Sequence, residues 1–278
     1  MLSVGDSSRV AELIREAAAA ELLPRFRNLS KDDIRQKRPG DVVTVADVAS
    51  EQRLASGLAR ILPGVPVVGE EAVEGDASLL ELIGRPGEAC WIVDPLDGTA
   101  NFAAGKDQFA IIVCLVQDAA TVGAWILDVP KGRMAVALKG QGVTLDGAAV
   151  VGKATGRAPN GFVGYKVRKD FDRQLPAADR KRLGRVTSLG CAGIEYLDIL
   201  AGRAAFGLYR ITKPWDHAGG ALMMAEAGGG AIRFDGAPYG PAQPINSGII
   251  SAASQATLSQ VRAIFETVRM PLLAGLGA

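Results

Sequence analysis

The stretch Cys90–Phe102, with the sequence CWIVDPLDGTANF, constrains the fold more than any other part of the chain. Its apolar run, Trp91 to Val93, predicts a short buried strand. Asp94-Pro95 and then Asp97-Gly98 predict chain breaks directly after that strand. Two carboxylates are therefore expected at the end of a core strand, next to exposed backbone amides. This arrangement suits a hard cation that is shared with a phosphate oxygen.

Three alternatives for this stretch were weighed. Asp-Pro and Asp-Gly pairs are common turn sequences, which would explain a single pair without any function. A calcium loop of the EF-hand type needs oxygen ligands at every second position, and Pro95 and Leu96 break that spacing. A phosphatase of the haloacid dehalogenase type needs an aspartate two residues before Asp97, where this chain has Pro95.

Composition narrows the class of protein. With 278 residues, 48% of them hydrophobic and 22% charged, the chain can bury a sizeable core. The net charge of +1 includes no basic run, so nucleic acid is not expected as the main ligand. No apolar run approaches the roughly 18–20 residues of a membrane span, and the polar N-terminus does not resemble a signal peptide. The sequence therefore predicts a cytoplasmic protein without a membrane anchor.

The metal-ligating residue types limit the chemistry further. The three cysteines, Cys90, Cys114 and Cys191, are scattered and are most simply buried thiols. His217 is the single histidine, so a histidine-rich zinc site is nearly excluded. Any metal chemistry must then be carboxylate chemistry, which favours Mg²⁺, Mn²⁺ or Ca²⁺.

The first half of the chain, residues 1–150, predicts an α+β arrangement. Ser7 or Ser8 is expected to cap a helix that runs to about Asn28, and Asp47 to cap a second helix that Pro63-Gly64 ends. Polar residues 31–41, with a Pro39-Gly40 turn, predict a mobile loop. Strands are expected at 42–45 and 65–68, and an antiparallel meander at 109–116, 121–129 and 134–138 continues into a hairpin at 141–150.

The second half, residues 151–278, predicts alternating strands and helices and therefore an α/β arrangement. Strands are expected at 161–167, 206–211 and 249–253, and helices at 176–185, 192–200 and 215–227, with a last helix after the final strand. Asp216 opens one of these helices, and Glu70 follows the strand at 65–68. Taken alone, Asp216 could be an ordinary first-turn acid and Glu70 part of a solvated Glu70-Glu71 pair.

Taken together, these acidic motifs resemble the inositol monophosphatase family. The resemblance rests on Gly69-Glu70-Glu71, on the stretch from Trp91 to Phe102, and on Trp215-Asp216-His217-Ala218-Gly219 with Glu226-Ala227-Gly228-Gly229 after it. Val42–Asp47 and Gly190-Cys191-Ala192 give weaker support. The motifs occur in order between residues 41 and 230, so the resemblance covers most of the chain.

The resemblance implies a layered αβαβα sandwich and a homodimer. It also implies a Mg²⁺-dependent, lithium-sensitive phosphomonoesterase with two or three Mg²⁺ ions per site. The implied metal ligands are Glu70, Asp94, the main-chain oxygen of Leu96, Asp97 and Asp216, with Asp94 bridging. The implied catalytic residues are Thr99, Asp47 and Glu70, where Thr99 and Asp47 orient the attacking water. The implied substrate-binding residues are Gly98, Thr99, Gly190, Cys191, Ala192, Tyr209 and Arg210.

Physical chemistry agrees with this scheme, because converging carboxylates repel a phosphate dianion until divalent ions reverse the local field. His217 is expected to face away from Asp216, since neighbouring residues on a helix point in different directions.

The residues before Trp215 depart from the family pattern. Animal inositol monophosphatases have a substrate-contacting acid there, whereas this chain has Tyr209 and Arg210, and Lys106-Asp107-Gln108 also differs from relatives. A guanidinium pairs with phosphate or carboxylate, so a substrate with a second anionic group becomes attractive. The alternatives within the family are fructose-1,6-bisphosphatase, 3′-phosphoadenosine-5′-phosphate phosphatase and histidinol-phosphate phosphatase. The alternative outside enzymes is a regulatory binding protein that kept the fold.

Overall fold

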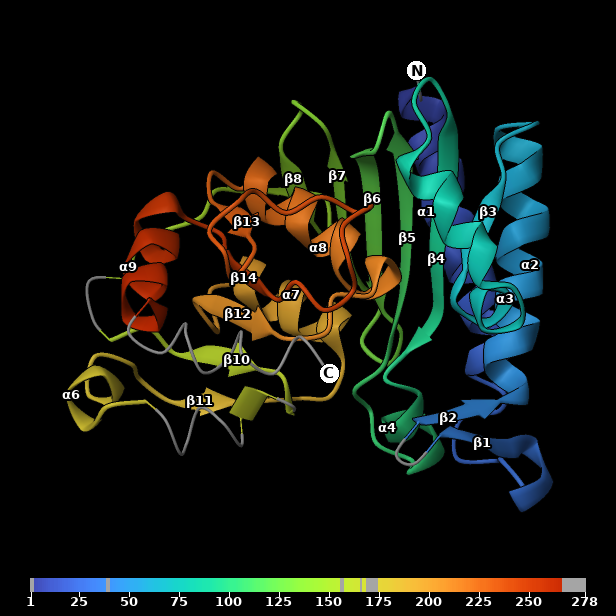
Figure 1. Cartoon of the computed structure of the whole chain (residues 1–278). Coiled ribbons are helices and arrows are strands. Elements are labelled where there is room, and N and C mark those ends of the chain that lie inside the picture. Colours follow the sequence, from blue (N-terminus) through green and yellow to red (C-terminus); the bar gives the residue numbers. More distant parts are fainter. Residues whose placement is uncertain (1–2, 39–40, 156–157, 166, 169–174, 267–278) are drawn as a thin grey trace.

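Five layers of helices and sheets stack across the molecule, as Figure 1 shows. The computed structural model describes residues 3–38, 41–155, 158–165, 167–168 and 175–266. Helices α1 (Val4–Ala17) and α2 (Val45–Ile61) form the first layer, and a seven-stranded sheet forms the second. Helices α7 (Ala192–Leu200) and α8 (Pro214–Glu226) lie between that sheet and a five-stranded sheet, which α9 (Gln255–Phe265) covers. The predicted αβαβα sandwich is confirmed.

The larger sheet has the strand order β3-β4-β5-β6-β7-β8-β9. Only β3 and β4 are parallel within it, and the remaining pairs are antiparallel, as the meander predicted. Its strands are β3 (Val67–Gly69), β4 (Ala89–Asp97), β5 (Ala110–Gln117), β6 (Ala120–Asp128), β7 (Arg133–Leu138), β8 (Val143–Leu145) and β9 (Ala148–Val150).

The smaller sheet mixes parallel and antiparallel pairs in the order β11-β10-β12-β14-β13. Its strands are β10 (Gly161–Val163), β11 (Val186–Thr187), β12 (Phe206–Tyr209), β13 (Gly230–Ile232) and β14 (Ile249–Ala252). Shorter elements are a π-helical turn at Ala18–Leu22, the 3₁₀ segments Lys31–Asp33 and Ala77–Gly84, and the helices α3 (Glu70–Gly75), α4 (Thr99–Ala103) and α6 (Ala177–Arg180).

Two predictions about the N-terminal region were wrong. Ser3 caps α1, and Thr44 caps α2 with Asp47 at the third helical position of a capping box. The polar segment expected to be a mobile loop is instead strand β1 (Ile34–Arg38), which pairs with β2 (Asp41–Thr44). Exposed residues alternate irregularly along β1, so no apolar face revealed the strand. The predicted Pro39-Gly40 turn lies outside the described residues.

In the second half, the expected strand at 161–167 ends at Val163, although residue 166 lies outside the description. The helix expected at 176–185 covers only Ala177–Arg180, and the short strands β11 and β13 were not predicted. Helix α7 matches its expected bounds. Whether residues 1–150 and 151–278 behave as separate domains stays a prediction.

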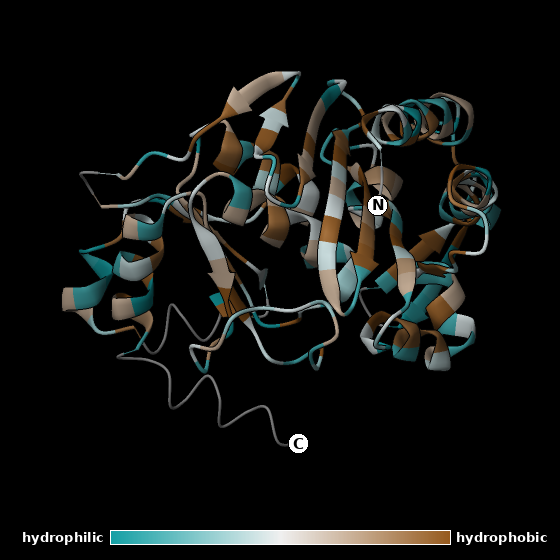
Figure 2. Cartoon of the chain, turned by 90° about the horizontal axis from the view of Figure 1, so that it is seen from above, coloured by the Kyte–Doolittle hydropathy of each residue, from teal (hydrophilic) through white to brown (hydrophobic). Residues whose placement is uncertain are grey.

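The core is continuous between the two sheets. One buried cluster joins Ile92 and Ile112 of the larger sheet to Tyr196 of α7 and Met223 of α8. A second cluster packs α1 and α2 on the opposite face of that sheet. In Figure 2 the strands carry mostly brown and pale residues, whereas the peripheral helices and loops carry most of the teal ones. None of the helices in the described ranges is long and apolar enough to cross a bilayer.

Candidate active site

A β-bulge places two aspartates on the same face of the larger sheet. Strand β4 does not end at Asp94, as expected, but continues to Asp97, and its register with β5 shifts between these two residues. Val93 faces α1 and α2, whereas Asp94 follows it on the opposite face. In a regular strand residues three apart point to opposite faces, and the extra bulge residue turns Asp97 back to the face of Asp94.

The bulge is held by hydrogen bonds that use the backbone groups around Pro95. The amide of Leu96 donates to Asp94 Oδ1 at 3.0 Å. The Ser50 hydroxyl donates to the Pro95 carbonyl at 3.0 Å, which ties the bulge to α2. Pro95 itself has no amide to leave unpaired, so it suits the irregular position.

Glu70 and Asp216 join these aspartates from two other elements. Gly69 of β3 pairs with Val93, so Glu70 at the start of α3 lies next to Asp94. Asp216 is in the first turn of α8, and its side chain hydrogen-bonds to that of Asp94. The structure therefore brings together the four predicted carboxylate ligands.

Electrostatics in this cluster are unfavourable to the charged forms. Asp94 is 1% exposed, and burial raises its pKa well above the ordinary value, with the neighbouring carboxylates raising it further. Burial also raises the pKa of Asp97, to about 6, and that of Asp216 well above its usual range. Buried acids that raise one another's pKa in this way form a site that a cation would stabilise.

A lysine already supplies part of that positive charge. Lys213 Nζ lies 2.8 Å from Glu70 Oε1. Burial disfavours the ammonium, but Glu70 and Asp216 outweigh this effect and raise the pKa of Lys213. Within the described part of the chain, no three acidic, cysteine or histidine side chains are close enough to hold a metal ion as they stand.

Thr99 and Asp47 form a second part of the site. The Thr99 hydroxyl lies 2.9 Å from Asp47 Oδ1 and 2.9 Å from the Leu96 carbonyl. Asp47 is 1% exposed, and its other oxygen accepts bonds from the amide and hydroxyl of Thr44. Burial raises the pKa of Asp47 to about 7, although the bonds from Thr44 and Thr99 act in the opposite direction.

Gly98 connects the bulge to α4 in a conformation that requires glycine. Its φ of +88° lies in the left-handed region, and a Cβ there would be 2.7 Å from the Gln108 carbonyl. The chain can therefore turn sharply from β4 into the helix that begins at Thr99.

The segment Ser188–Ala192 lies against this turn. Asn101 Nδ2 donates to the Leu189 carbonyl at 2.8 Å. Cys191 is buried, with its Sγ 3.2 Å from Asp97 Oδ2, and the Gly193 amide donates to the same oxygen at 2.5 Å. Burial raises the pKa of Cys191 well above the ordinary value, so the residue is a neutral thiol that supports Asp97.

Glu195 anchors this segment from below. It is 1% exposed, and its carboxylate accepts bonds from the Leu189 amide at 2.5 Å and the Tyr209 hydroxyl at 2.5 Å. Burial raises the pKa of Glu195 to about 7. Tyr209, expected to bind substrate, is thus buried with its hydroxyl donated to Glu195.

His217 has a structural environment. Its Nδ1 lies 3.1 Å from the Tyr196 hydroxyl and its Nε2 3.1 Å from the Ile211 carbonyl. Burial lowers the pKa of His217 to about 3, so the ring is neutral. The expectation that His217 is not the catalytic base agrees with this geometry.

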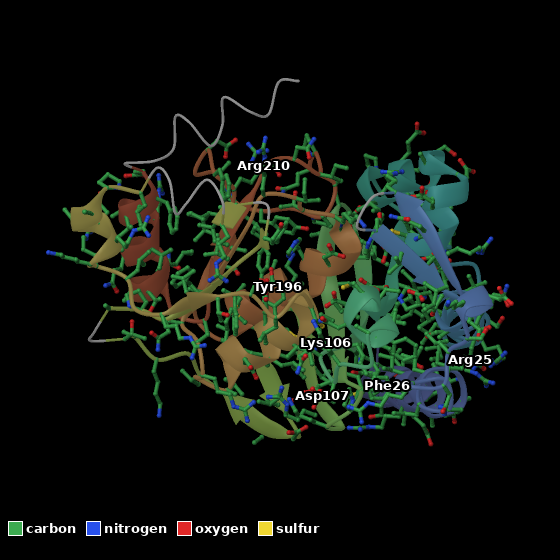
Figure 3. All side chains as sticks on the ribbon, turned by 90° about the horizontal axis from the view of Figure 1, so that it is seen from below. Arg25, Phe26, Lys106, Asp107, Tyr196 and Arg210 are labelled. Carbon is green, nitrogen blue, oxygen red and sulfur yellow. The ribbon has the colours of Figure 1, made fainter. Side chains whose placement is uncertain are left out.

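Arg210 is half-buried directly after β12. Figure 3 shows Arg210 well apart from Lys106 and Asp107, with Tyr196 between them in this view. The two departures from the family pattern therefore lie in different parts of the molecule.

Two residues of the site were not singled out from the sequence. Lys213 directly precedes Pro214-Trp215-Asp216, and its position next to an expected ligand was the available signal. Glu195 is a lone acid in the otherwise apolar start of α7, a pattern that indicates a buried carboxylate with partners.

The donor set fits Mg²⁺. All the candidate ligands offer hard oxygen atoms, from four carboxylates and the Leu96 carbonyl, and Asp94 is buried among like charges. Zinc would instead favour histidine and thiolate ligands, and Cys191 is a buried neutral thiol.

Comparison with known proteins agrees with this fold and this site. The inositol monophosphatase family matches the chain over residues 6–269. The chain is 30% identical to the Nus factor SuhB of Pseudomonas aeruginosa over 234 residues, which cover 79% of this chain and 82% of that protein. It is 32% identical to the inositol-1-monophosphatase SuhB of Mycobacterium tuberculosis over 201 residues, 68% of each chain.

The fold is also found among solved structures. An IMPase from Thermotoga maritima superposes with a TM-score of 0.76 at 21% identity, covering 93% of this chain and 96% of that one. The layered sandwich with acidic groups at a strand bulge and at two helix starts defines a class of α/β phosphatases. The chain belongs to the inositol monophosphatase family.

Proposed function

We propose that the protein is a Mg²⁺-dependent phosphomonoesterase that hydrolyses a small-molecule phosphate. The observation that carries this proposal is the buried cluster of Asp94, Asp97 and Asp216, in which each carboxylate has other acids as neighbours. Such a cluster costs stability unless cations occupy it. A family whose curated members include inositol-1-monophosphatases supports the same activity.

In this proposal Glu70, Asp94 and the Leu96 carbonyl hold one Mg²⁺, and Asp94, Asp97 and Asp216 hold a second. Bound Mg²⁺ supplies a Lewis acid and lowers the pKa of water. The Thr99 hydroxyl donates to Asp47, which leaves its oxygen lone pairs free to accept a proton from the attacking water. Asp47 then receives the proton through Thr99, and the Gly98 and Thr99 amides hold phosphate oxygens.

The substrate class follows from the neighbouring side chains. Tyr209 and Arg210 stand where animal inositol monophosphatases have an acid, so we infer a substrate with a second anionic group as well as the scissile phosphate. Sugar bisphosphates, 3′-phosphoadenosine 5′-phosphate and histidinol phosphate are the alternatives to inositol monophosphate. Histidinol phosphate is the one of these with a cationic amine in place of a second anion.

A second candidate function is a regulatory binding protein. The Pseudomonas relative carries the name Nus factor, which is not the name of an enzyme. The intact set of carboxylates with Thr99 favours turnover, since a binding protein has no physical need for a buried repulsive cluster. Lithium sensitivity, a homodimer and a cytoplasmic location stay predictions.

The test is release of inorganic phosphate from a panel of inositol, sugar, nucleotide and histidinol phosphates, assayed with MgCl₂ and with EDTA. We expect at least one substrate to be hydrolysed in MgCl₂ and none in EDTA. Turnover that EDTA leaves intact would contradict the metal-dependent mechanism. The absence of turnover on the whole panel would favour the binding protein.

A further inference from the structure

Lys213 holds its charge inside the carboxylate site on a fixed backbone. It caps the N-terminus of α8, its carbonyl accepts a bond from the Asp216 amide at 3.2 Å, and Pro214 follows it. The backbone is therefore constrained, and the four-carbon side chain decides where the ammonium lies.

The ammonium and a divalent ion need the same carboxylate. Lys213 Nζ is 2.8 Å from Glu70 Oε1, and the two side chains are 32% and 16% exposed. Mg²⁺ binds carboxylate oxygens at about 2.0–2.1 Å, so an ion on Glu70 would lie a few ångströms from the ammonium. Two cations this close repel strongly where water screens them poorly.

A second position for the ammonium is within reach. Nζ lies 5.4 Å from the centroid of the Trp215 ring, and the face of an indole attracts a cation. The lysine can thus leave Glu70 without losing every favourable contact.

We propose that Lys213 is a tethered cation that competes with a divalent ion for Glu70 and so sets the metal affinity of the site. Without metal, the lysine neutralises one member of the acidic cluster. When metal binds, the ammonium moves off Glu70, and the work of moving it weakens binding. This inference rests on the proposed metal-dependent function, because it assumes that Glu70 is a ligand.

Binding of Mn²⁺ to the full-length, EDTA-stripped protein tests the inference without any substrate, with free Mn²⁺ followed by electron paramagnetic resonance. Lys213→Met removes the charge and keeps the length of the side chain, so its Kd should fall about tenfold or more. Lys213→Arg keeps the charge and should not tighten binding. Lys213→Gln gives the same test as Lys213→Met if the methionine variant does not fold.

Lys139→Met is the matched control, since it changes the net charge equally. Lys139 is exposed and follows β7 at the end of the sheet opposite to Arg133, which pairs with Asp128 at the edge of the site. This variant should bind Mn²⁺ as the wild type does.

An unchanged or weaker Kd for Lys213→Met, with metal-dependent phosphate release intact in the wild type, would overturn this inference alone. An equal tightening in Lys139→Met would also overturn it, since net charge would then explain the effect. If neither the wild type nor any variant bound Mn²⁺, the proposed function would be overturned together with the inference.

Discussion

Two groups of buried aspartates at one edge of the larger sheet have opposite surroundings. Asp97 pairs with Ala110, and Ala110 pairs with Asp128, so the ends of β4 and β6 are one strand apart. Asp128 is 0% exposed, and Arg133 binds its Oδ2 with two nitrogens at 2.7 and 2.9 Å. Arg133 also reaches Asp198 at 2.9 Å.

Asp94 is equally buried but has acids where Asp128 has an arginine. A buried carboxylate with a bidentate arginine is a satisfied structural group. A buried carboxylate among other carboxylates is stable only when protonated or bound to a cation that the chain does not supply in full. The contrast teaches that partners, rather than burial or position in the sheet, separate a functional carboxylate from a structural one.

The largest expected effect is on turnover. Asp94→Asn removes the bridging charge and should lower kcat by at least about 10²–10³-fold, because charge stabilisation at the reacting centre is lost. Asp128→Asn should leave kcat within a few-fold, provided that the protein is assayed below its unfolding temperature. Phosphate release at saturating MgCl₂ measures both variants, and comparable losses in the two would remove the distinction drawn between the clusters.

A neutral residue on the functional side should behave differently from its charged neighbours. Thr99→Ala should lower kcat by about 10²–10⁴-fold, since the hydroxyl positions a proton transfer. Its Mn²⁺ affinity should stay close to that of the wild type. The control is Thr44→Ala, which loses the cap of α2 and about 1 kcal/mol of stability. A loss of kcat under about fivefold in Thr99→Ala would rule out the proposed role.

A cation outside both clusters should affect substrate choice. A charge-assisted contact is worth about 1.5–3 kcal/mol, so Arg210→Ala should reduce kcat/KM for a doubly anionic substrate about ten- to a hundredfold. Its kcat/KM for a neutral-polyol monophosphate should hardly change. Steady-state kinetics on one substrate of each kind measure the difference, and equal losses on both would make Arg210 structural.

The smallest effect concerns stability and pH, and Glu195 is the test residue. Its folded-state pKa of about 7 lies above the ordinary 4.5, so its stabilising contribution is complete below pH 4.5 and is lost as the pH rises through 7. From pH 5 to pH 8 this loss amounts to at most about 3 kcal/mol.

Glu195→Gln cannot titrate, so its free energy of unfolding in urea should rise relative to that of the wild type by up to that amount between pH 5 and pH 8. Comparing the two proteins cancels the opposite pH dependence of His217, whose pKa is lowered. Parallel pH profiles of the wild type and Glu195→Gln would contradict the pKa assigned to Glu195.

Local patterns predicted the helices and the meander well, because apolar periodicity there reports burial directly. The same logic failed for β1, whose Arg35, Gln36 and Arg38 are exposed and leave no apolar face to detect. The bulge was also beyond reach, since Asp94-Pro95 signals a break and the sequence cannot show that β5 continues to pair beyond it. A sequence-level pattern thus located the carboxylates but not the geometry that turns them to one face.

The partners of the site residues were hardest to predict. Glu195 and Tyr209 meet from α7 and β12, and Lys213 and Glu70 are far apart in the chain, so no short spacing relates them. The motif that located Asp94 gave no information on whether an arginine would lie beside it. That information distinguishes the cluster around Asp94 from the one around Asp128.

Thermal unfolding of the wild type, Asp94→Asn and Asp128→Asn, each in EDTA and in MgCl₂, tests the central claim most directly. In EDTA we expect Asp94→Asn to melt above the wild type, because a buried repulsion is relieved, and Asp128→Asn to melt well below it, because Arg133 loses its partner. MgCl₂ should raise the melting temperature of the wild type and leave that of Asp94→Asn nearly unchanged. An Asp94→Asn variant that melts as far below the wild type as Asp128→Asn, with no effect of MgCl₂ on the wild type, would contradict the account.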